Sequence, residues 1–252
     1  MRTNRIRDIW NSGGNVVNGW LAAASSYTAE VMATQNFDSI GVDLQHGMID
    51  FKDGFEMLQA ISVHSPTPIA RIPWNDPTWI MKTLDAGAMG LVCPMVNNAE
   101  EAASFVGACR YPPAGYRSYA GVRGPMLMGP DYINRVDELV IAFAMIETKE
   151  ALDRIEEIVK VPGLDAVYIG PSDLALGLGY PPVADPTEPE VLEAIEHIRR
   201  VSDAAGVMPC IHTAGGDHAK RLFEQGFRLC TLANELAFMR RAAGEEIGKA
   251  RG

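Results

Sequence analysis

Ionisable side chains that could take part in acid–base or metal chemistry stand at the ends of several short apolar runs. These side chains are Asp43, His46, Arg71, Glu147 and Asp173. If the runs are parallel strands, their carboxyl ends meet at one mouth, where the five side chains would converge. Each residue alone has an ordinary structural explanation, such as a helix cap for an aspartate. Five converging residues favour a catalytic site.

Glu147 and Asp173 are the pair that suggests a metal. Two carboxylates on adjacent strands repel each other unless a positive charge lies between them. Two protein carboxylates leave most of an octahedral shell free for water and a chelating substrate, which suits Mg²⁺ or Mn²⁺. The alternative is structural: each carboxylate caps a following helix, because helical patterns begin directly after both residues.

Arg71 lies in an apolar run and keeps its charge when buried, so it must face an anion. That anion is either a substrate carboxylate or enolate, or a protein carboxylate such as Asp43. His46 is a candidate acid or base because histidine titrates near neutral pH, and Gly47 beside it permits a tight turn. Asp43 and Asp85 are the carboxylates best suited to orient His46.

Covalent Schiff-base chemistry would need a lysine at a strand end inside the site. The six lysines all fall in helical patterns, although Lys149 stands just behind Glu147. We therefore expect metal-assisted chemistry without a Schiff-base lysine.

The elements that must position these residues alternate along the chain. Apolar runs that predict strands are separated by amphipathic stretches that predict helices. The predicted strands are 15–20, 39–44, 68–72, 90–93, 141–146, 166–169, 207–211 and 229–232. The predicted helices are 51–63, 77–86, 99–110, 149–159, 188–205, 217–225 and 236–250. Repeated strand–helix units predict a parallel sheet, and about eight strands favour an α/β fold of the (β/α)8 TIM-barrel class.

An open, doubly wound sheet would satisfy the same alternation. Its dinucleotide-binding form carries a G-x-G-x-x-G turn after the first strand, whereas Ser12-Gly13-Gly14 precedes the first strand here. We therefore prefer the closed barrel and expect no bound nucleotide. One connection, 111–140, is unusually long and rich in Gly, Pro and Arg. A loop of this length is either a surface excursion or part of an active site or subunit contact.

Composition excludes several function classes. The 252 residues are 47% hydrophobic and 21% charged, and 22 basic against 32 acidic side chains give a net charge of −10, which disfavours nucleic acid as a partner. The four cysteines are widely spread without C-x-x-C, which favours a reducing compartment. No segment approaches about 18 uninterrupted apolar residues, so we expect no membrane association and a cytoplasmic protein. Nothing marks a domain boundary, so 1–252 is predicted to be a single domain.

The chain resembles, nearly end to end, the HpcH/HpaI group of metal-dependent (class II) pyruvate aldolases, which includes 4-hydroxy-2-oxoheptane-1,7-dioate aldolase and 2-keto-3-deoxy-sugar-acid aldolases. The resemblance rests on several motifs together. They are Ser25-Ser26-Tyr27-Thr28-Ala29-Glu30, Val42-Asp43-Leu44-Gln45-His46-Gly47, Arg71-Ile72-Pro73-Trp74-Asn75-Asp76-Pro77, Val92-Cys93-Pro94-Met95-Val96, Arg110-Tyr111-Pro112-Pro113-Ala114-Gly115, Ile146-Glu147-Thr148 and Ile169-Gly170-Pro171-Ser172-Asp173-Leu174.

The resemblance implies reversible aldol cleavage of 4-hydroxy-2-oxo acids to pyruvate, or a close 2-oxo acid, and an aldehyde, through an enolate held on the metal. Glu147 and Asp173 would hold the metal, which is Mg²⁺ or Mn²⁺ with Co²⁺ or Zn²⁺ as further options. Backbone N–H groups around Ser172 and Asp173 would receive the substrate carboxylate. Arg71 would stabilise the enolate oxygen. His46, oriented by Asp43 or Asp85, would move the proton of the substrate hydroxyl.

The resemblance also implies an assembly. A homo-hexamer built as a trimer of dimers is expected, with the C-terminal helix 236–250 exchanged between subunits and Asp85 reaching a neighbour's site. Trp20 is either a wall of the aldehyde side or an ordinary core residue. His212 follows a strand where relatives have aliphatic residues, and it either touches the aldehyde portion or caps a helix.

Two other functions fit the same residues. One is a related metal-dependent lyase or decarboxylase, with a CoA thioester as one candidate substrate, although the sequence shows no clear basic patch for CoA. The other is a non-catalytic barrel that binds a small acid. Hydrogen exchange at C3 of pyruvate separates the second from an aldolase, because only the enzyme would enolise pyruvate.

Overall fold

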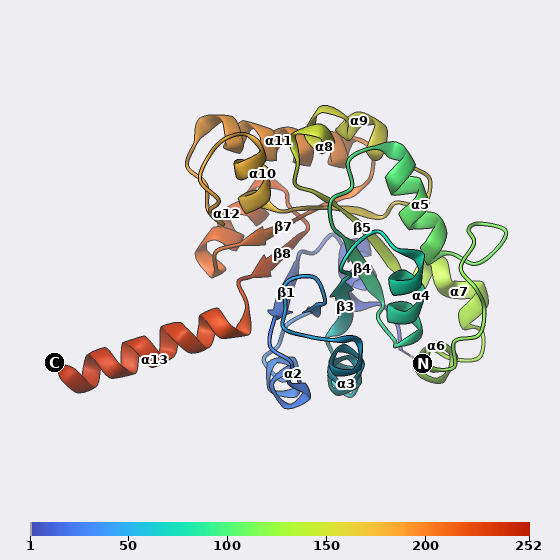
Figure 1. The fold of residues 1–252 in the computed structure, drawn as a ribbon, viewed down its shortest axis with the longest axis horizontal. Helices are drawn as coiled ribbons and strands as arrows, with labels where there is room; N and C mark the ends of the chain where they lie inside the picture. Colours follow the sequence, from blue (N-terminus) through green and yellow to red (C-terminus); the bar gives the residue numbers. More distant parts are fainter. Residues whose placement is uncertain (1) are drawn as a thin grey trace.

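Eight parallel strands close into a barrel within residues 2–252, the part of the chain that this computed structural model describes (Figure 1). The strands pair in chain order, and the last returns to the first. They are β1 (Val16–Leu21), β2 (Ser39–Asp43), β3 (Thr67–Arg71), β4 (Gly90–Cys93), β5 (Ile141–Ile146), β6 (Ala166–Ile169), β7 (Met208–Thr213) and β8 (Leu229–Leu232). The predicted TIM barrel is confirmed, and each predicted strand lies within one or two residues of an observed one.

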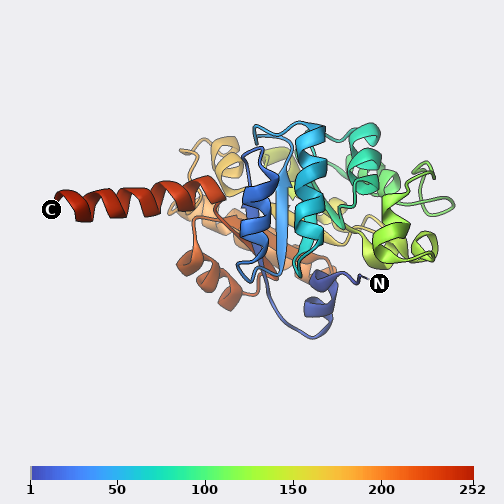
Figure 2. The same cartoon turned by 90° about the horizontal axis from the view of Figure 1, so that it is seen from below.

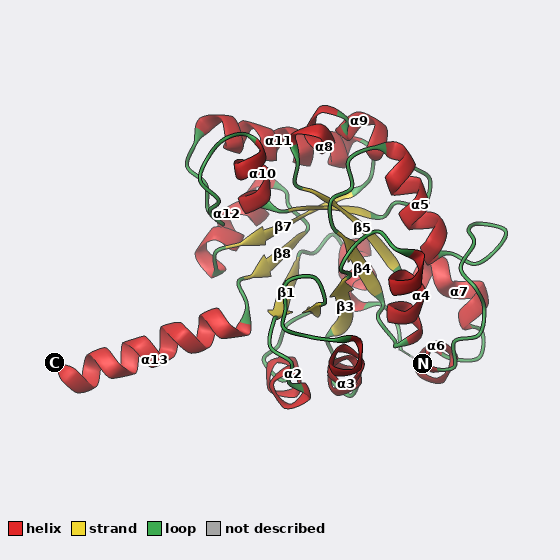
Figure 3. Ribbon diagram, viewed as in Figure 1, coloured by secondary structure: helices red, strands yellow, loops and turns green. Residues whose placement is uncertain are grey.

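The helices of the described chain lie outside the barrel, and most of them surround the strands (Figure 3). They are α1 (Arg5–Asn11), α2 (Ser26–Ala33), α3 (Phe51–Ser62), α4 (Pro77–Asp85), α5 (Ala99–Cys109), α6 (Arg123–Met128), α7 (Tyr132–Leu139), α8 (Lys149–Asp153), α9 (Ile155–Ile158), α10 (Pro171–Gly177), α11 (Pro189–Ala204), α12 (Gly216–Gln225) and α13 (Glu235–Arg251). Local signals begin several of them. Asp76 caps α4 with Pro77 in its first turn, and Asn98 caps α5. Among these helices, none is long and apolar enough to cross a membrane in the part of the chain described here.

Sequence patterns missed or merged some elements. The predicted helix 149–159 is two short helices, α8 and α9, because the chain leaves the helical conformation at Arg154 (φ −119°, ψ 15°). The short helices α1 and α2 were not predicted. The connection 111–140, expected to be an irregular loop, contains α6 and α7. It links a helix to the strand that follows, so it lies at the end of the barrel where strands begin, away from the mouth.

Apolar side chains form two layers. The larger layer lies between the strands and the helices, and the smaller one fills the barrel interior. Helix α1 lies below the strands at one end of the barrel (Figure 2), where its Ile6 and Trp10 are buried. The Trp10 ring meets Phe143 edge to face, with ring centroids 6.1 Å apart. The interior is therefore plugged from this end, so a small ligand has access only from the mouth.

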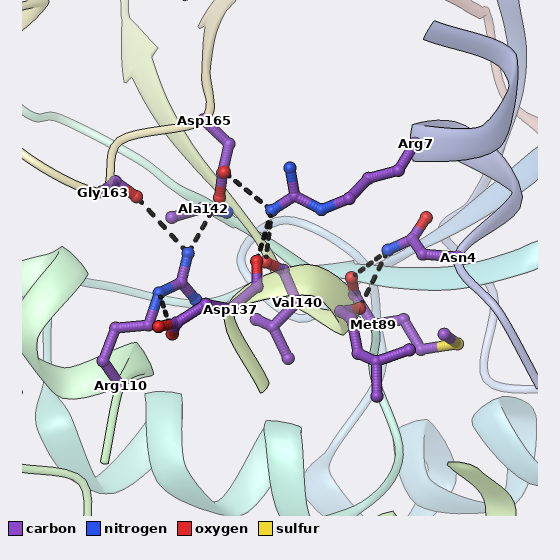
Figure 4. Close-up of polar contacts among 10 residues, drawn as sticks. Asn4, Arg7, Met89, Arg110, Asp137, Val140, Ala142, Gly163 and Asp165 are labelled. Carbon is purple, nitrogen blue, oxygen red and sulfur yellow. Dashed lines mark hydrogen bonds and ion pairs between the residues drawn. The ribbon is translucent and has the colours of Figure 1, made fainter. Parts of the chain in front are cut away.

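A charged cluster ties the plugged end together (Figure 4). Asp165, just before β6, accepts hydrogen bonds from Arg7 at 2.7 Å, from Arg110 at 2.9 Å and from the backbone N–H of Ala142 at 2.8 Å. Arg110 also pairs with Asp137 at 3.1 Å. The cluster joins α1, the end of α5 and the starts of β5 and β6.

The C-terminal helix stands apart from the barrel. Figure 1 shows α13 projecting from the body along most of its length. Only its first residue, Glu235, is buried, and its side chain accepts the backbone N–H groups of Ala22 and Ala23. Beyond that anchor, Leu236, Met239 and Ile247 are exposed at spacings that place them along one stripe of the helix.

Candidate active site

A cavity of about 280 Å³ opens at the carboxyl ends of the strands. Most of the site residues predicted from the sequence line it. Its lining residues are Trp20, Ala22, Asp43, His46, Arg71, Met145, Gly170, Pro171, Ser172, Asp173, His212 and Asn234. Glu147 stands directly behind Gly170 of this wall. The barrel thus brings together residues from seven of its eight strands or the segments that directly follow them.

Arg71 and Asp43 form a two-pronged ion pair at the cavity wall. The parallel register sets Asp43 of β2 opposite Arg71 of β3. Arg71 Nε donates to Asp43 Oδ1 at 2.9 Å, and Nη2 donates to Oδ2 at 2.6 Å. Burial opposes the charge of Asp43, but these hydrogen bonds and the guanidinium charge outweigh it and hold the pKa of Asp43 below its usual value. The protein carboxylate that could neutralise Arg71 is therefore present, and it leaves Nη1 for another partner.

Asp43 orients the turn around His46 rather than the imidazole ring. Its Oδ1 accepts the backbone N–H groups of Gln45 and His46, both at 3.2 Å, and Oδ2 accepts Trp20 Nε1–H at 3.3 Å. A Cβ on Gly47 would collide with the Asp43 carbonyl oxygen, so only glycine permits this turn. Asp43 thus contacts His46 through its backbone N–H, and the predicted orientation of the imidazole by Asp43 stays a prediction.

Glu147 lies just past β5, and Asp173 lies near it in the first turn of α10, which follows β6. Met95 (φ 55°) donates its backbone N–H to Glu147 Oε1 at 2.8 Å. A Cβ on Gly170 would lie 2.8 Å from Glu147 Oε2, so glycine is needed for this close approach. Burial raises the pKa of Glu147, the Asp173 charge raises it further, and the Met95 N–H and Arg71 oppose the rise. The two carboxylates therefore repel each other, and the Met95 N–H and Arg71 offset only part of the rise in the pKa of Glu147.

The helix-cap alternative fails for Glu147. Thr148 is the residue that caps α8, accepting the N–H of Ala151. Asp173 lies in the first turn of α10, whose N-cap is Gly170, and makes no side-chain cap. Both carboxylates thus keep oxygens for another partner. No group of three or more His, Cys, Asp or Glu side chains that could hold a metal occurs in residues 2–252. The two carboxylates offer hard oxygen donors to a cation that keeps its remaining positions for water or substrate.

Asp85 is not part of this cavity. It ends α4, and its Oδ1 accepts a hydrogen bond from Arg117 at 2.6 Å. Arg117 is fully enclosed and also donates to the Tyr132 hydroxyl at 3.0 Å. Within one chain, Asp85 therefore cannot orient His46; it holds the 111–140 connection instead. The predicted reach of Asp85 into a neighbour's site stays a prediction.

Trp20 and His212 form one side of the cavity. Trp20 is buried and packs nearly parallel to Tyr168, with the rings 6.0 Å apart, while His212 meets it edge to face at 5.7 Å. Trp20 is therefore both a core residue and a cavity wall. His212 lies on β7 and caps no helix in the described chain. No lysine lines the cavity in residues 2–252, and Lys149 pairs at 2.6 Å with Asp153 on the surface of α8.

Sequence reasoning missed several contributors to the site. Met95, Gly170, Tyr168 and Asn234 all support or line the cavity. Gly170 and Met95 stood inside motifs already singled out. Nothing local marked Tyr168 or Asn234, because only closure of the barrel brings them to the site.

The fold and the cavity together define a TIM-barrel enzyme with an acidic pair and an arginine at its mouth. The family model for HpcH/HpaI aldolase/citrate lyase matches residues 18–242, and the chain belongs to that family. It is 42% identical to a hydroxypyruvate/pyruvate aldolase of Rhizorhabdus wittichii over 98% of this chain and 99% of that protein. It is 36% identical to a 4-hydroxy-2-oxo-heptane-1,7-dioate aldolase of Salmonella paratyphi C, over 95% of this chain and 92% of the relative.

A solved structure has the same fold. The crystal structure of an HpcH/HpaI aldolase/citrate lyase family protein from Burkholderia cenocepacia aligns with a TM-score of 0.90 and 29% sequence identity, covering 98% of each chain. The similarity therefore extends over the whole barrel and is not limited to the motifs at its mouth.

Proposed function

We propose that this protein is a carbon–carbon lyase that cleaves 4-hydroxy-2-oxo acids reversibly to pyruvate, or a close 2-oxo acid, and an aldehyde. The observation that carries the proposal is the placement of Glu147, Asp173 and Arg71 around one small cavity. An acidic pair that can hold a cation beside a guanidinium suits a substrate that gains negative charge at its keto oxygen. The names of the aldolase relatives support the same reaction.

Glu147 and Asp173 would hold a divalent cation, Mg²⁺ or Mn²⁺ by preference, with Co²⁺ or Zn²⁺ as further options. Such a cation would supply Lewis-acid polarisation of the 2-oxo acid. The donor set fits this role because both carboxylates keep free oxygens and Arg71 is already engaged by Asp43.

The chain's own residues would divide the remaining work. Arg71 Nη1, left free by Asp43, would donate to the oxygen that becomes negative when the carbon–carbon bond breaks. Backbone N–H groups of Ser172 and Asp173, in the first turn of α10, would receive the carboxylate. His46 would take the proton of the substrate hydroxyl during cleavage and return it during addition. Trp20 and His212 would bound the aldehyde side.

Proton–deuterium exchange at C3 of pyruvate, followed by NMR, tests the proposal without any aldehyde. We expect chelator-stripped protein to catalyse exchange only after Mg²⁺ or Mn²⁺ is added. Glu147→Gln should abolish it, whereas Glu150→Gln, the same change at an exposed residue three positions on, should leave it intact. Lack of exchange with every metal, in folded protein, would contradict the aldolase assignment.

We further propose that residues 1–252 form a single domain and that the protein is cytoplasmic. We also propose that six copies of the chain assemble into a homo-hexamer, arranged as a trimer of dimers. The projecting helix α13 supports this assembly, because an exposed apolar stripe away from the body suits a neighbouring subunit. Exchange of α13 between subunits would cover that stripe.

A further inference from the structure

His212 presents one ring nitrogen to the cavity and the other to the barrel interior. Its Nδ1 lies 3.2 Å from the Tyr168 hydroxyl oxygen. Its Nε2 has no hydrogen-bond partner in the described residues and is not sealed from solvent, and the ring lines the cavity. The tautomer of this histidine therefore decides whether the cavity receives a hydrogen-bond donor or an acceptor.

A buried chain of hydrogen bonds favours one tautomer of His212. Ser39 Oγ donates to Asn18 Oδ1 at 2.7 Å, so the Asn18 amide group must face the other way, and it donates to Thr231 Oγ1 at 2.8 Å. The Tyr168 hydroxyl donates to the same Thr231 oxygen at 2.6 Å. A phenol carries a single proton. With that proton given to Thr231, the Tyr168 oxygen can only accept, so the proton between Tyr168 and His212 belongs to Nδ1.

The chain has little freedom to reverse. Asn18, Ser39 and Thr231 are completely buried, and Tyr168 is nearly so, so water cannot supply replacement partners. The imidazole also stays neutral near physiological pH. Burial, reinforced by the positive charge of Arg71 and opposed by Asp43, lowers the pKa of His212 to about 4. A neutral ring with its proton on Nδ1 leaves a lone pair on Nε2.

We propose that His212 Nε2 is a hydrogen-bond acceptor for a hydroxyl group of the substrate, so that the site selects hydroxylated substrates over analogues with hydrogen at the same position. This inference rests on the proposed aldolase function and names the substrate class for it. The hydroxyl belongs either to the 2-oxo acid, at C3 as in hydroxypyruvate, or to the aldehyde, next to its carbonyl as in glycolaldehyde. Both present the same donor to the same nitrogen.

The tautomer can be measured without any catalysis. In protein labelled with ¹⁵N-histidine, the resonances lost in His212→Phe identify the ring. We expect a protonated Nδ1 and an unprotonated Nε2 in the native protein, and a mixture of tautomers in Tyr168→Phe. Adding hydroxypyruvate or glycolaldehyde, but not pyruvate or acetaldehyde, should shift the Nε2 resonance. A ring protonated at Nε2, or equal shifts with both members of each pair, would overturn the inference even if the protein catalyses no aldol reaction.

Kinetics then assign the source of the hydroxyl. Hydroxypyruvate is compared with pyruvate as the donor, and glycolaldehyde with acetaldehyde as the acceptor. Losing one hydrogen bond to a substrate hydroxyl should lower the kcat/KM preference for the hydroxylated member about tenfold in His212→Phe. His212→Gln, which keeps an acceptor near Nε2, should retain most of the preference. If the preference for hydroxypyruvate over pyruvate falls, the hydroxyl belongs to the 2-oxo acid. If the preference for glycolaldehyde over acetaldehyde falls, the hydroxyl belongs to the aldehyde. Unchanged preferences in a folded, active His212→Phe protein would refute the proposal and leave the aldolase assignment standing.

Discussion

The guanidinium of Arg71 binds a protein carboxylate with two of its nitrogens and keeps the third for the proposed substrate. Two of its nitrogens bind Asp43, while Nη1 lies 4.0 Å from the Met145 sulfur at the cavity wall. Asp43 therefore sets the direction in which Nη1 points. Lysine would keep the positive charge but has no fork that binds Asp43 and a substrate oxygen together.

We accordingly expect Arg71→Lys to lower pyruvate C3 exchange by about 100-fold or more, the usual loss when a donor to a developing oxyanion is removed. The folded state should survive, because a cation still faces the buried Asp43 carboxylate. Exchange rates and melting temperatures of the two proteins provide the test. Exchange within threefold of the native rate would remove Arg71 from the enolisation step.

His212 also makes stability depend on pH. Its pKa is lowered to about 4 in the folded protein, through burial and Arg71, against an ordinary value near 6.5. Between these pH values the unfolded chain binds a proton that the folded chain does not. The free energy of unfolding must therefore fall as the pH falls from 6.5 to 4, with a contribution of up to about 3 kcal/mol.

Denaturant unfolding at several pH values checks this expectation. Arg71, Asp43 and Tyr168 are the ionisable groups that face the ring, and His212→Gln leaves all three in place. The native protein should lose more stability than His212→Gln over the same pH interval. Parallel pH profiles for the two proteins would mean that the folded state protonates His212 as readily as the unfolded chain.

At the scale of elements, the Asp165 cluster joins four segments at the closed end of the barrel. Its carboxylate binds two arginines, of which Arg110 is almost fully buried. Asp165→Asn would leave both cations short of a partner, and breaking a buried pair costs about 3–5 kcal/mol. We expect a loss near the lower end of that range, because Arg7 is partly exposed and Asp137 still pairs with Arg110.

Asp153→Asn is the matched control for this change. Asp153 pairs with Lys149 on the surface, where both side chains are more than half exposed. Its loss should cost no more than about 0.5 kcal/mol. Denaturant unfolding compares the two variants, and pyruvate exchange should persist in both because neither residue lies in the cavity. Similar stabilities for the two variants would show that the cluster does not hold the barrel end together.

The alternation of apolar runs with amphipathic stretches, together with helix-capping residues, made most strands and helices predictable. Strands of a parallel barrel are buried on both faces, so they appear as continuous apolar runs such as 141–146, which is β5. Asp76-Pro77 and Asn98 marked helix starts. Helices α1 and α2 are only seven and eight residues long, and α1 becomes recognisable once Ile6 and Trp10 are seen to plug the barrel. Short helices stabilised by tertiary contacts leave a weak periodic signal.

The site was predictable where its residues follow strands and hidden where it depends on closure. Asp43, Arg71, Glu147 and Asp173 each end or follow an apolar run, so one topological rule gathered them. The partners of His212 could not be found in that way. Tyr168 and Thr231 are 63 residues apart in sequence, and Asn18 and Thr231 are 213 apart. They meet because β6, β7 and β8 pair in order and β8 closes on β1.

At the scale of the whole molecule, α13 is the helix whose apolar side chains stay exposed to solvent in a single subunit. We expect deletion of residues 236–252 to leave the barrel folded, because Glu235 and its contacts with Ala22 and Ala23 remain. The same deletion should reduce the oligomer to smaller species, measured by light scattering coupled to size-exclusion chromatography. An unchanged oligomer would place the subunit contacts elsewhere on the barrel.

The polar chain from Ser39 to His212 has an evolutionary consequence. Five strands contribute to it, and its first four members, from Ser39 to Tyr168, lie in a space closed to water. Replacing one member by an apolar residue leaves a polar group of its neighbour without a hydrogen bond, which costs about 1–3 kcal/mol of folding free energy. Replacing both partners together can be nearly neutral. Substitutions along the chain are therefore epistatic. A protein in which an aliphatic residue replaced His212 would lose stability unless Tyr168 changed as well. We therefore expect the residues at these two positions to covary among relatives.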